Sequence, residues 1–246
     1  MSKGTLVLID ADMFVHRSAV AVERATDWDG EVWTLTADLD DAKDKFRSLV
    51  ADAEDIVEDP SAELVMVFSP SGPVFRHSFW PTYKEGRGRK PLVHRALKEW
   101  VSQNYADAMW PGLEADDVLG ILATHPKNAK RRVVIVSGDK DLAQIPTTIY
   151  DFNRQTWTEV SEEEADMAHL LQTLTGDPVD KYPGCPGIGA KRAPAIAAAG
   201  WPAIVAAFEK AGLTEDEALI QARLARILRF TDYDHANKEP ILWQPH

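Results

Sequence analysis

The stretch TLVLID, residues 5–10, is an uninterrupted apolar run, rich in β-branched residues, that ends on an aspartate. Similar short runs occur at residues 64–68 (LVMVF) and 133–136 (VVIV), and long helical patterns separate them. Strands that alternate with helices are typical of a parallel sheet covered by helices. We therefore predict an α/β fold with a mostly parallel central sheet flanked by helices. In such a fold, ligands bind beyond the carboxyl ends of the strands.

The segments between and after these strands carry helical patterns. Residues 38–57 have an apolar stripe on one helical face and charges on the other, which predicts an outer covering helix. We interpret its aspartates as a solvated face, because charge runs on amphipathic helices are usually solubilising. Ser161 followed by Glu164 is a capping box, which opens a wholly helical part of the chain. Helices are predicted there over residues 161–174, from about Ala190 onward, and over residues 215–230.

The composition places limits on the class of protein. The 246 residues are 45% hydrophobic, which is enough to fill the core of one large domain with a small appendage. No apolar run approaches the ~20 residues needed to span a bilayer, and the start does not resemble a secretory signal. We therefore expect a cytoplasmic protein with no membrane partner. The single cysteine, Cys185, has no neighbours at zinc-ligand spacing, and we expect it to be a small buried residue.

The net charge of -12 at pH 7 argues at first against a nucleic-acid partner, because phosphate binding depends on Lys and Arg. The distribution of charge matters more than its sum. One segment concentrates basic residues against a single acid, Glu85. These basic residues are Arg76, Lys84, Arg87, Arg89, Lys90, Arg95 and Lys98.

Residues 70–91, which overlap this segment, are irregular and form a connection longer than the usual ~4 to 6 residues. Aromatic residues are interleaved with its basic residues, an arrangement suited to stacking on bases together with phosphate contact. The alternative is a surface loop with a hydrophobic foot. The aromatic residues are Phe75, Phe79, Trp80 and Tyr83.

Carboxylates gather at the strand ends and helix starts. They would repel one another in one cleft unless cations lay between them, so their pattern predicts a Mg²⁺ site for phosphate chemistry. On a helix, Glu114 and Asp117 share a face and can reach one ion, while Asp116 points to a neighbouring position. The alternatives are that acids favour the first turn of a helix and that Asp139 is only a helix cap. The acids are Asp10, Glu114, Asp116, Asp117, Asp139, Asp141, Asp177 and Asp180.

The stretch GCPGIGAK, residues 184–191, has the composition of a helix-hairpin-helix loop. Glycines allow backbone N–H groups to approach phosphate closely, and Lys191 adds a positive charge. A short glycine-rich loop is weak evidence by itself, but Asp177 and Asp180 lie just upstream. The seven histidines are scattered and suggest no catalytic triad.

Together these segments resemble the 5′-nuclease superfamily of flap endonucleases and 5′→3′ exonucleases, and most of all the compact exonucleases of tailed bacteriophages. The matching stretches occur in family order over nearly the whole chain. They are LIDAD, FRHSFWPTYKEGR, GLEADDVLG, SGDKDLAQIP, GDPVDKYPGCPGIGAKRA and ARILRFTDYDHANKEPILW. The resemblance implies a PIN-like catalytic domain over residues 1–160, with an arch loop at 70–98, and a helical duplex-binding region over residues 161–246.

The resemblance also implies an activity and its cofactors. The expected reaction is hydrolysis of DNA phosphodiesters during replication, from 5′ ends or at flaps, with RNA in an RNA:DNA hybrid as a further substrate. The eight acids would hold two Mg²⁺ ions, with Mn²⁺ as a substitute, and the glycine-rich loop would hold a K⁺ ion. The expected partners are DNA with 5′ ends, flaps or nicks, and the protein is expected to be a monomer in the host cytoplasm if it is phage-encoded.

Individual residues receive roles by the same resemblance. Lys84 and Arg87 are expected to contact the scissile phosphate, and Asp10, Asp116 and Asp139 to complete the catalytic set. The expected DNA-binding residues are Arg76, Tyr83, Lys84, Arg87, Arg89, Lys90, Gly187, Gly189, Lys191 and Arg192.

One position departs from the family pattern. Many relatives carry a metal-binding aspartate directly after the second strand, where this chain has Ser69. Serine is a poor Mg²⁺ ligand, although its hydroxyl could hold a metal-bound water. The first alternative to a metal-dependent nuclease is therefore a non-catalytic protein that binds 5′ ends or flaps. The second is an RNA-directed PIN nuclease, which the helical region after Gly176 disfavours.

Overall fold

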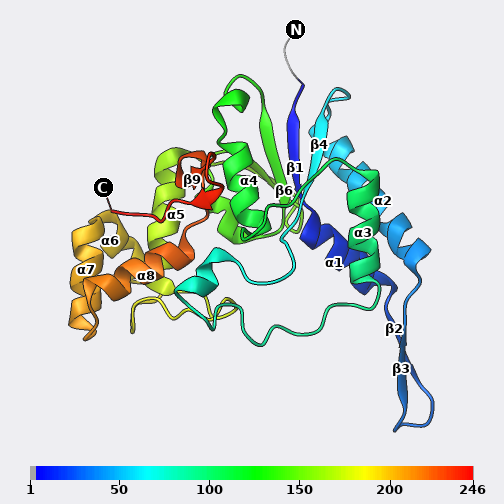
Figure 1. Cartoon of the computed structure of the whole chain (residues 1–246), viewed down its shortest axis with the longest axis horizontal. Coiled ribbons are helices and arrows are strands. Elements are labelled where there is room, and N and C mark those ends of the chain that lie inside the picture. Colours follow the sequence, from blue (N-terminus) through cyan, green and yellow to red (C-terminus); the bar gives the residue numbers. More distant parts are fainter. Residues whose placement is uncertain (1–3, 246) are drawn as a thin grey trace.

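The computed structural model describes residues 4–245 and contains a six-stranded sheet in the order β5-β4-β1-β6-β7-β8 (Figure 1). All neighbouring strands are parallel except β7 and β8. The predicted mostly parallel sheet is therefore confirmed. The strands are β1 Leu6–Asp10, β4 Glu63–Val67, β5 Asp107–Ala108, β6 Val133–Ser137, β7 Thr148–Asp151 and β8 Thr156–Glu159.

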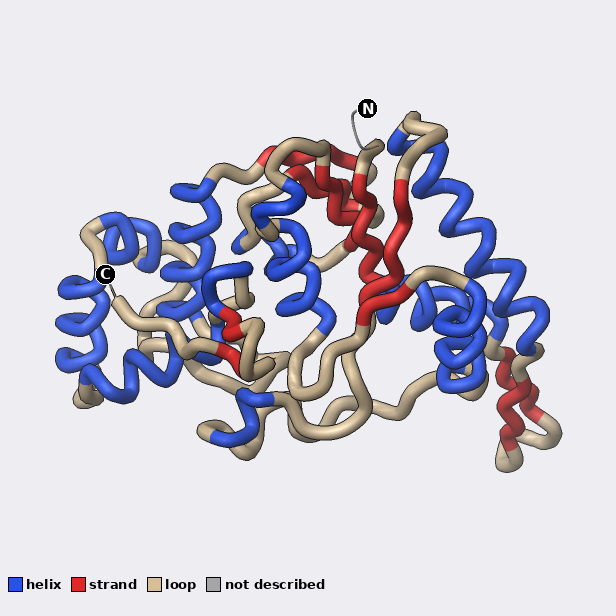
Figure 2. The backbone as a smooth tube through the Cα atoms, turned by 45° about the horizontal axis from the view of Figure 1, so that its top comes forward, coloured by secondary structure: helices blue, strands red, loops and turns tan. Residues whose placement is uncertain are grey.

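Strand β1 lies at the centre of the sheet and is buried along its whole length. Val7 and Ile9 belong to one apolar cluster, and Leu6 and Leu8 belong to a second. Because successive side chains of a strand point to opposite faces, both faces of the sheet are covered. Figure 2 shows the strands as one twisted layer between helices. These helices are α1 Ala11–Val22, α2 Leu39–Val57 and α3 His94–Asn104 against the first cluster, and α4 Ala115–Ala123 against the second.

Helix α2 is the covering helix that the sequence predicts. The Asp38 side chain caps it by accepting hydrogen bonds from the backbone N–H groups of Asp40 and Asp41. Phe46 and Val50 are buried on its inner face. The Asp40 side chain remains exposed to solvent, as expected for a solvated face.

The C-terminal helices surround an apolar cluster of their own, which includes the buried Cys185. The predicted capping box is present: the Ser161 hydroxyl accepts from the Glu164 N–H, and the Glu164 carboxylate accepts from the Ser161 N–H. The helices are α5 Glu162–Thr175, α6 Ala193–Ala198, α7 Trp201–Lys210 and α8 Glu215–Ala225.

Two predicted helix boundaries are wrong. The helix expected from about Ala190 begins at Ala193, and the helix expected to reach residue 230 ends at Ala225. The second error has a tertiary cause. The backbone N–H of Ile227 donates to the Gln144 side chain, and that of Leu228 donates to Asp117. Because these contacts lie in the core, the chain leaves the helix to make them.

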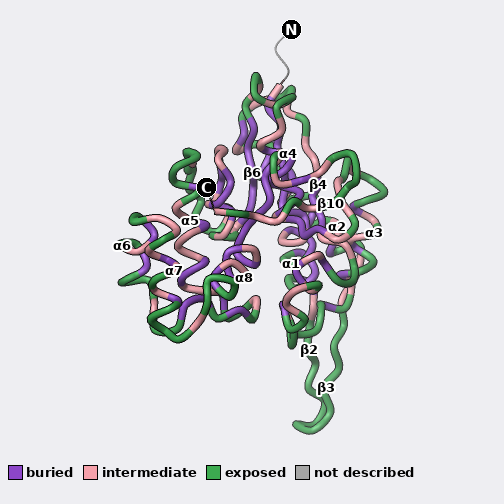
Figure 3. The backbone as a smooth tube through the Cα atoms, turned by 60° about the vertical axis from the view of Figure 1, so that its left-hand side comes forward, coloured by how far each residue is buried: buried purple, intermediate pink, exposed green. Residues whose placement is uncertain are grey.

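The remaining elements are short. A hairpin of β2 Arg24–Asp27 and β3 Trp33–Thr36, which the sequence analysis did not predict, projects from the body as an exposed arm (Figure 3). Residues 4–245 include no helix that is both long and apolar enough to cross a membrane. The other short elements are the 3-10 helices η1 Phe75–Ser78, η2 Pro126–Asn128, η3 Lys140–Gln144 and η4 Phe230–Asp232, and the strands β9 Tyr233–Asp234 and β10 Glu239–Pro240.

Gly120 of α4 gives a test of how the C-terminal tail docks on this helix. A Cβ atom at Gly120 would lie 2.2 Å from the Leu228 carbonyl oxygen. Gly→Ala within a helix is normally favourable, but overpacking of this kind costs about 1–3 kcal/mol. We therefore expect Gly120→Ala to lower the urea midpoint of unfolding. Gly88→Ala, where a Cβ meets no atom within 4 Å, is the control, and equal midpoints would contradict the docking.

Candidate active site

Four of the predicted acids, Asp10, Glu114, Asp116 and Asp139, line one cleft with a volume of about 760 Å³. Asp10 ends β1, Asp139 follows β6, and Asp116 lies in the first turn of α4. Strands β1 and β6 are parallel neighbours, so their carboxyl ends meet at one edge of the sheet. The structure therefore brings together acids that are more than one hundred residues apart in the sequence.

The charged forms of Asp10, Asp116 and Asp139 are destabilised by burial and by neighbouring carboxylates. Burial raises the pKa of Asp10 to about 6, with Asp12 and Asp139 adding to the rise, while hydrogen bonds oppose it. Burial, and then Asp139, raise the pKa of Asp116 well above its usual range. The pKa of Asp139 is raised by burial in the same way. Carboxylate oxygens that destabilise one another's charge fit a hard divalent cation.

The carboxylate oxygens suit a divalent cation by their chemistry, but they do not form a coordination shell in advance. Within residues 4–245, no group of three or more His, Cys, Asp or Glu side chains stands ready to hold one ion. The Asp10 carboxylate is instead fixed by the Ser137 hydroxyl at 2.7 Å and the Met13 N–H at 3.1 Å. The strand ends thus orient at least one candidate ligand.

A second group of acids lies around Tyr182. Burial raises the pKa of this tyrosine, and the negative charges of Asp141, Asp177 and Asp180 raise it further. The Lys140 ammonium lies 2.7 Å from Asp141 and 3.9 Å from Asp177. The predicted acids are therefore divided between two neighbouring sites.

Asp117 belongs to neither group in this structure, and its role as a metal ligand stays a prediction. It is fully buried, and both its carboxylate oxygens accept hydrogen bonds from Arg76, at 2.7 and 2.8 Å. Glu114 accepts from the same guanidinium at 3.1 Å. The two acids do share a helical face and a cation, as the spacing predicts, but the cation is Arg76.

Two residues expected to contact DNA are buried instead. Arg76 is 2% exposed, and its guanidinium also donates to the Leu224 carbonyl. Tyr83 is 4% exposed, and its hydroxyl bonds to Glu114 at 2.8 Å and Asp180 at 3.1 Å. In this structure both side chains link the loop to the protein interior, and their contacts with DNA stay predictions.

The structure places Lys84 and Arg87 among the acids. The Lys84 ammonium bonds to Glu114 and lies 3.4 Å from Asp180. Burial lowers the pKa of Lys84, but Glu114 and Asp116 outweigh it, so the pKa is raised and the group is cationic. Arg87 donates to Asp180 at 2.8 Å. Lys84 and Arg87 both line the cleft of Asp10, as expected of phosphate-contacting residues.

The other expected DNA contacts lie at the surface. Arg89 is exposed and paired with Glu23, and Lys90 is exposed at the rim of the cleft. Gly187 and Gly189, together with Lys191 and Arg192, form an exposed loop before α6. Their role in DNA binding stays a prediction.

Sequence reasoning missed Asp12 and Lys98, which also line the cleft. Asp12 lies two residues after Asp10 in the LIDAD stretch, and that spacing places it in the first turn of α1. Ser69, the residue that departs from the family pattern, lies beside them. Its hydroxyl accepts a hydrogen bond from the Ala115 N–H at 3.0 Å and so supports the start of α4.

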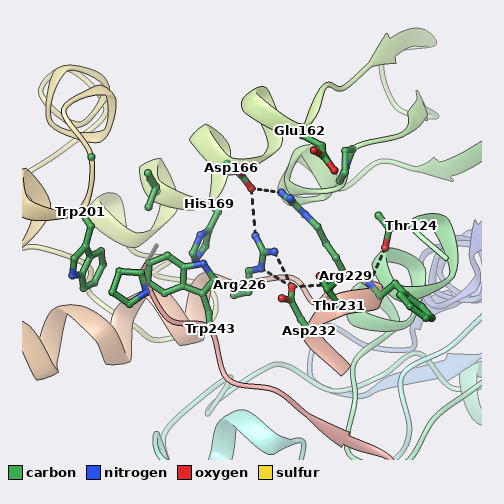
Figure 4. Close-up of a pocket in the computed structure, with 15 residues that line it drawn as sticks. Thr124, Glu162, Asp166, His169, Trp201, Arg226, Arg229, Thr231, Asp232 and Trp243 are labelled. Atoms are coloured by element: carbon green, nitrogen blue, oxygen red, sulfur yellow. Dashed lines mark hydrogen bonds and ion pairs between the residues drawn. The ribbon is translucent and has the colours of Figure 1, made fainter. Parts of the chain in front are cut away.

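A second cavity, of about 450 Å³, lies between α5 and the C-terminal tail (Figure 4). Arg226 and Arg229 point into it, but both bond to carboxylates of the protein, Asp232 and Asp166. Trp243 lies edge-on against His169, with ring centroids 5.0 Å apart. This cavity holds none of the predicted acids, so the cleft of Asp10 is the candidate active site.

Comparison with known proteins agrees with this fold. A family model described as the N-terminal resolvase-like domain of 5′-3′ exonucleases matches residues 5–171. The chain is 31% identical to the exodeoxyribonuclease of Enterobacteria phage T3, covering 99% of this chain and 93% of that protein. It is 30% identical to the exonuclease of Escherichia phage T7, with 99% and 94% covered.

The fold is also shared with solved structures. A bacteriophage T5 flap endonuclease in complex with DNA and metal ions matches with a TM-score of 0.66 at 15% identity, over 90% of this chain and 88% of that one. The T5 5′-exonuclease with bound zinc gives 0.65 at 15% identity, over 90% and 89%. The family model and the phage relatives identify a nuclease with 5′→3′ exonuclease or flap endonuclease activity. The chain belongs to the 5′-3′ exonuclease family.

The buried pair of Arg76 and Asp117 is expected to be essential for stability. Arg76→Met leaves a buried carboxylate without its partner, and such a loss costs about 3–5 kcal/mol. We expect a large fall in the urea midpoint of unfolding. Arg89→Met removes an exposed guanidinium that pairs with Glu23 and should leave the midpoint unchanged. Equal effects of the two substitutions would contradict the structural role of Arg76.

The raised pKa of Asp10 predicts a pH dependence of stability in the presence of chelator. Folded Asp10, with a pKa of about 6, holds its proton more tightly than the unfolded chain, so stability falls as pH rises from about 4 to 6. Asp10→Asn removes this loss. The free energy of unfolding of the variant, relative to that of the wild type, should rise by about 2–3 kcal/mol between pH 4 and pH 7. If urea unfolding gave the same difference in free energy of unfolding between the two proteins at every pH, the raised pKa of Asp10 would be contradicted.

Proposed function

We propose that the chain hydrolyses DNA phosphodiesters at the cleft of Asp10, Asp116 and Asp139 in a reaction that depends on divalent metal ions. The observation that carries this proposal is that three carboxylates with raised pKa values line the same cleft as the cationic Lys84 side chain. Without a cation these groups would be protonated or would repel one another. The T5 nucleases that share the fold have structures with metal ions, which supports the proposal.

The proposed cofactors are two Mg²⁺ ions, with Mn²⁺ as a substitute. Oxygen ligands from carboxylates suit both metals. When bound, the ions supply a water of lowered pKa and stabilise charge on the attacking and leaving oxygens. The proposed ligands are Asp10, Glu114, Asp116 and Asp139 at one site, and Asp141, Asp177 and Asp180 at the second.

Lys84 and Arg87 supply the positive charge for the phosphate itself. They come from the long loop over the cleft, and acids on two other segments hold their side chains in place. Cationic groups aimed in advance at developing negative charge lower the barrier without reorganisation. Arg89 and Lys90 extend this basic surface along the rim.

Duplex binding is proposed for the glycine-rich loop before α6. Gly187 has a φ of 72°, a left-handed conformation that suits glycine, and Lys191 and Arg192 are exposed beside it. Gly189 allows a backbone to approach closely, and carbonyls of the loop are proposed to hold a K⁺ ion. The proposed substrates are DNA with 5′ ends, flaps or nicks and RNA:DNA hybrids. The proposed enzyme is a cytoplasmic monomer, in the host cytoplasm if the protein is phage-encoded. Its proposed regions are a catalytic region (1–160) and a duplex-binding region (161–246).

Asp116→Asn tests the proposal. Cleavage of end-labelled duplex and 5′-flapped DNA should require Mg²⁺, start at the 5′ end or the flap junction, and fall by about 10³-fold or more in the variant. Binding of flapped DNA should remain. The control is Asp52→Asn, on the solvated face of α2, which should cut normally. Tight binding without products from the wild type would favour the non-catalytic alternative.

A further inference from the structure

Lys98 of α3 lines the cleft of Asp10, and two hydrogen bonds hold its ammonium group in one place. Nζ donates to the Asp12 carboxylate at 2.9 Å and to the Ser69 carbonyl at 2.6 Å. It also lies 4.8 Å from the centre of the Phe68 ring. An ammonium has three N–H donors. Two are used here, and no residue between 4 and 245 accepts the third.

These contacts tie Lys98 to the acids of the cleft. Asp12 lies close enough to Asp10 to raise its pKa. The Ser69 hydroxyl accepts from the N–H of Ala115, the residue before Asp116. A short chain of hydrogen bonds therefore fixes the ammonium relative to the carboxylates that are proposed to carry the reaction.

Lys98 also differs from Lys84 and Arg87 in the kind of backbone element that carries its side chain. Lys84 and Arg87 lie on an irregular loop, whereas Lys98 lies on a helix whose Leu97 and Val101 are buried in the core. Its side chain is 22% exposed, so it is accessible but restrained. A cation that is already ordered and partly desolvated binds phosphate more strongly than a mobile surface lysine.

Other basic residues line the cleft together with Lys98, and they include Lys90 and Arg95. Burial lowers the pKa of His94, which also lines the cleft, to about 4; Lys90 and Lys98 lower it further and Asp12 opposes them, so the imidazole is neutral. Lys98 therefore shares the cleft with acids such as Asp12 and with further cationic groups.

We propose that Lys98 binds a phosphate of the cleaved strand next to the scissile one, with Asp12 and the Ser69 carbonyl as positioning groups. This inference rests on the proposed function and adds a substrate-binding residue to it. The phosphate oxygen accepts the third N–H of the ammonium. The bonds to Asp12 and Ser69 hold the donor in place before the substrate arrives.

Salt-dependent binding tests the inference, because a lost phosphate contact changes the slope of log K against log salt. In an Asp116→Asn background, which binds without cutting, Lys98→Met should weaken binding of 5′-flapped DNA about 5–10-fold and reduce the slope by about 0.7–0.9. Lys98→Arg should retain most of the slope. Lys98→Gln, whose amide can still donate to the protein, should lose it without unfolding.

Lys43→Met is the matched control. The Lys43 ammonium lies 2.7 Å from Asp40 and 5.9 Å from the centre of the Trp100 ring, and its side chain is 20% exposed, so its surroundings resemble those of Lys98 outside the cleft. This variant should keep the full slope. A full slope in both Lys98→Met and Lys98→Gln would show only a structural ion pair and overturn the inference. Absence of binding by the parent protein would refute the proposed function instead.

Discussion

The buried guanidinium of Arg76 is the interaction on which the arrangement of the cleft depends. It donates to Asp117 and Glu114 of α4 and to backbone carbonyls of Leu224 and Arg226, so it joins the long loop, the helix and the C-terminal tail at one point. A charge removed from water is tolerated only when its hydrogen bonds are satisfied. All three segments must therefore be in place together, and the orientation of α4 is fixed as a consequence.

This constraint explains why neighbouring acids have different roles. Arg76 draws Glu114 and Asp117 toward one side of α4, and Asp116, about 100° further round the helix from Asp117, then faces the cleft. Asp117, whose carboxylate is fully buried against Arg76, contributes to stability. Asp116, whose pKa is raised by burial, lines the cleft and is available for a metal ion and for chemistry. The same sequence of four residues thus supplies both a structural pair and a catalytic candidate.

Periodicity was enough to predict the parts of the fold that burial determines, such as β1, β4, β6 and the covering helix α2. The acids at the ends of β1 and β6 could also be placed together, because parallel strands bring their ends to one edge. What the sequence could not show is which side chains are internally paired. Arg76 and Lys84 are both basic residues of one loop, yet the first is buried in an ion pair and the second lines the cleft. The end of α8 at Ala225 likewise depends on contacts with Gln144 and Asp117, far away in the sequence.

Contacts between the loop over the cleft and the region that follows α5 make the two regions interdependent. The Lys84 N–H donates to the Asp180 carbonyl, and the Trp80 indole donates to the Lys181 carbonyl. The residue proposed to contact the scissile phosphate is thus held by the segment that leads into the proposed duplex-binding loop. The net charge of -12 is compatible with a nucleic-acid substrate, because many acids lie on solvated faces or in internal ion pairs, whereas cations line the cleft. Duplex seated on the glycine-rich loop would reach a phosphate-binding surface that the segment just before this loop helps to hold in position.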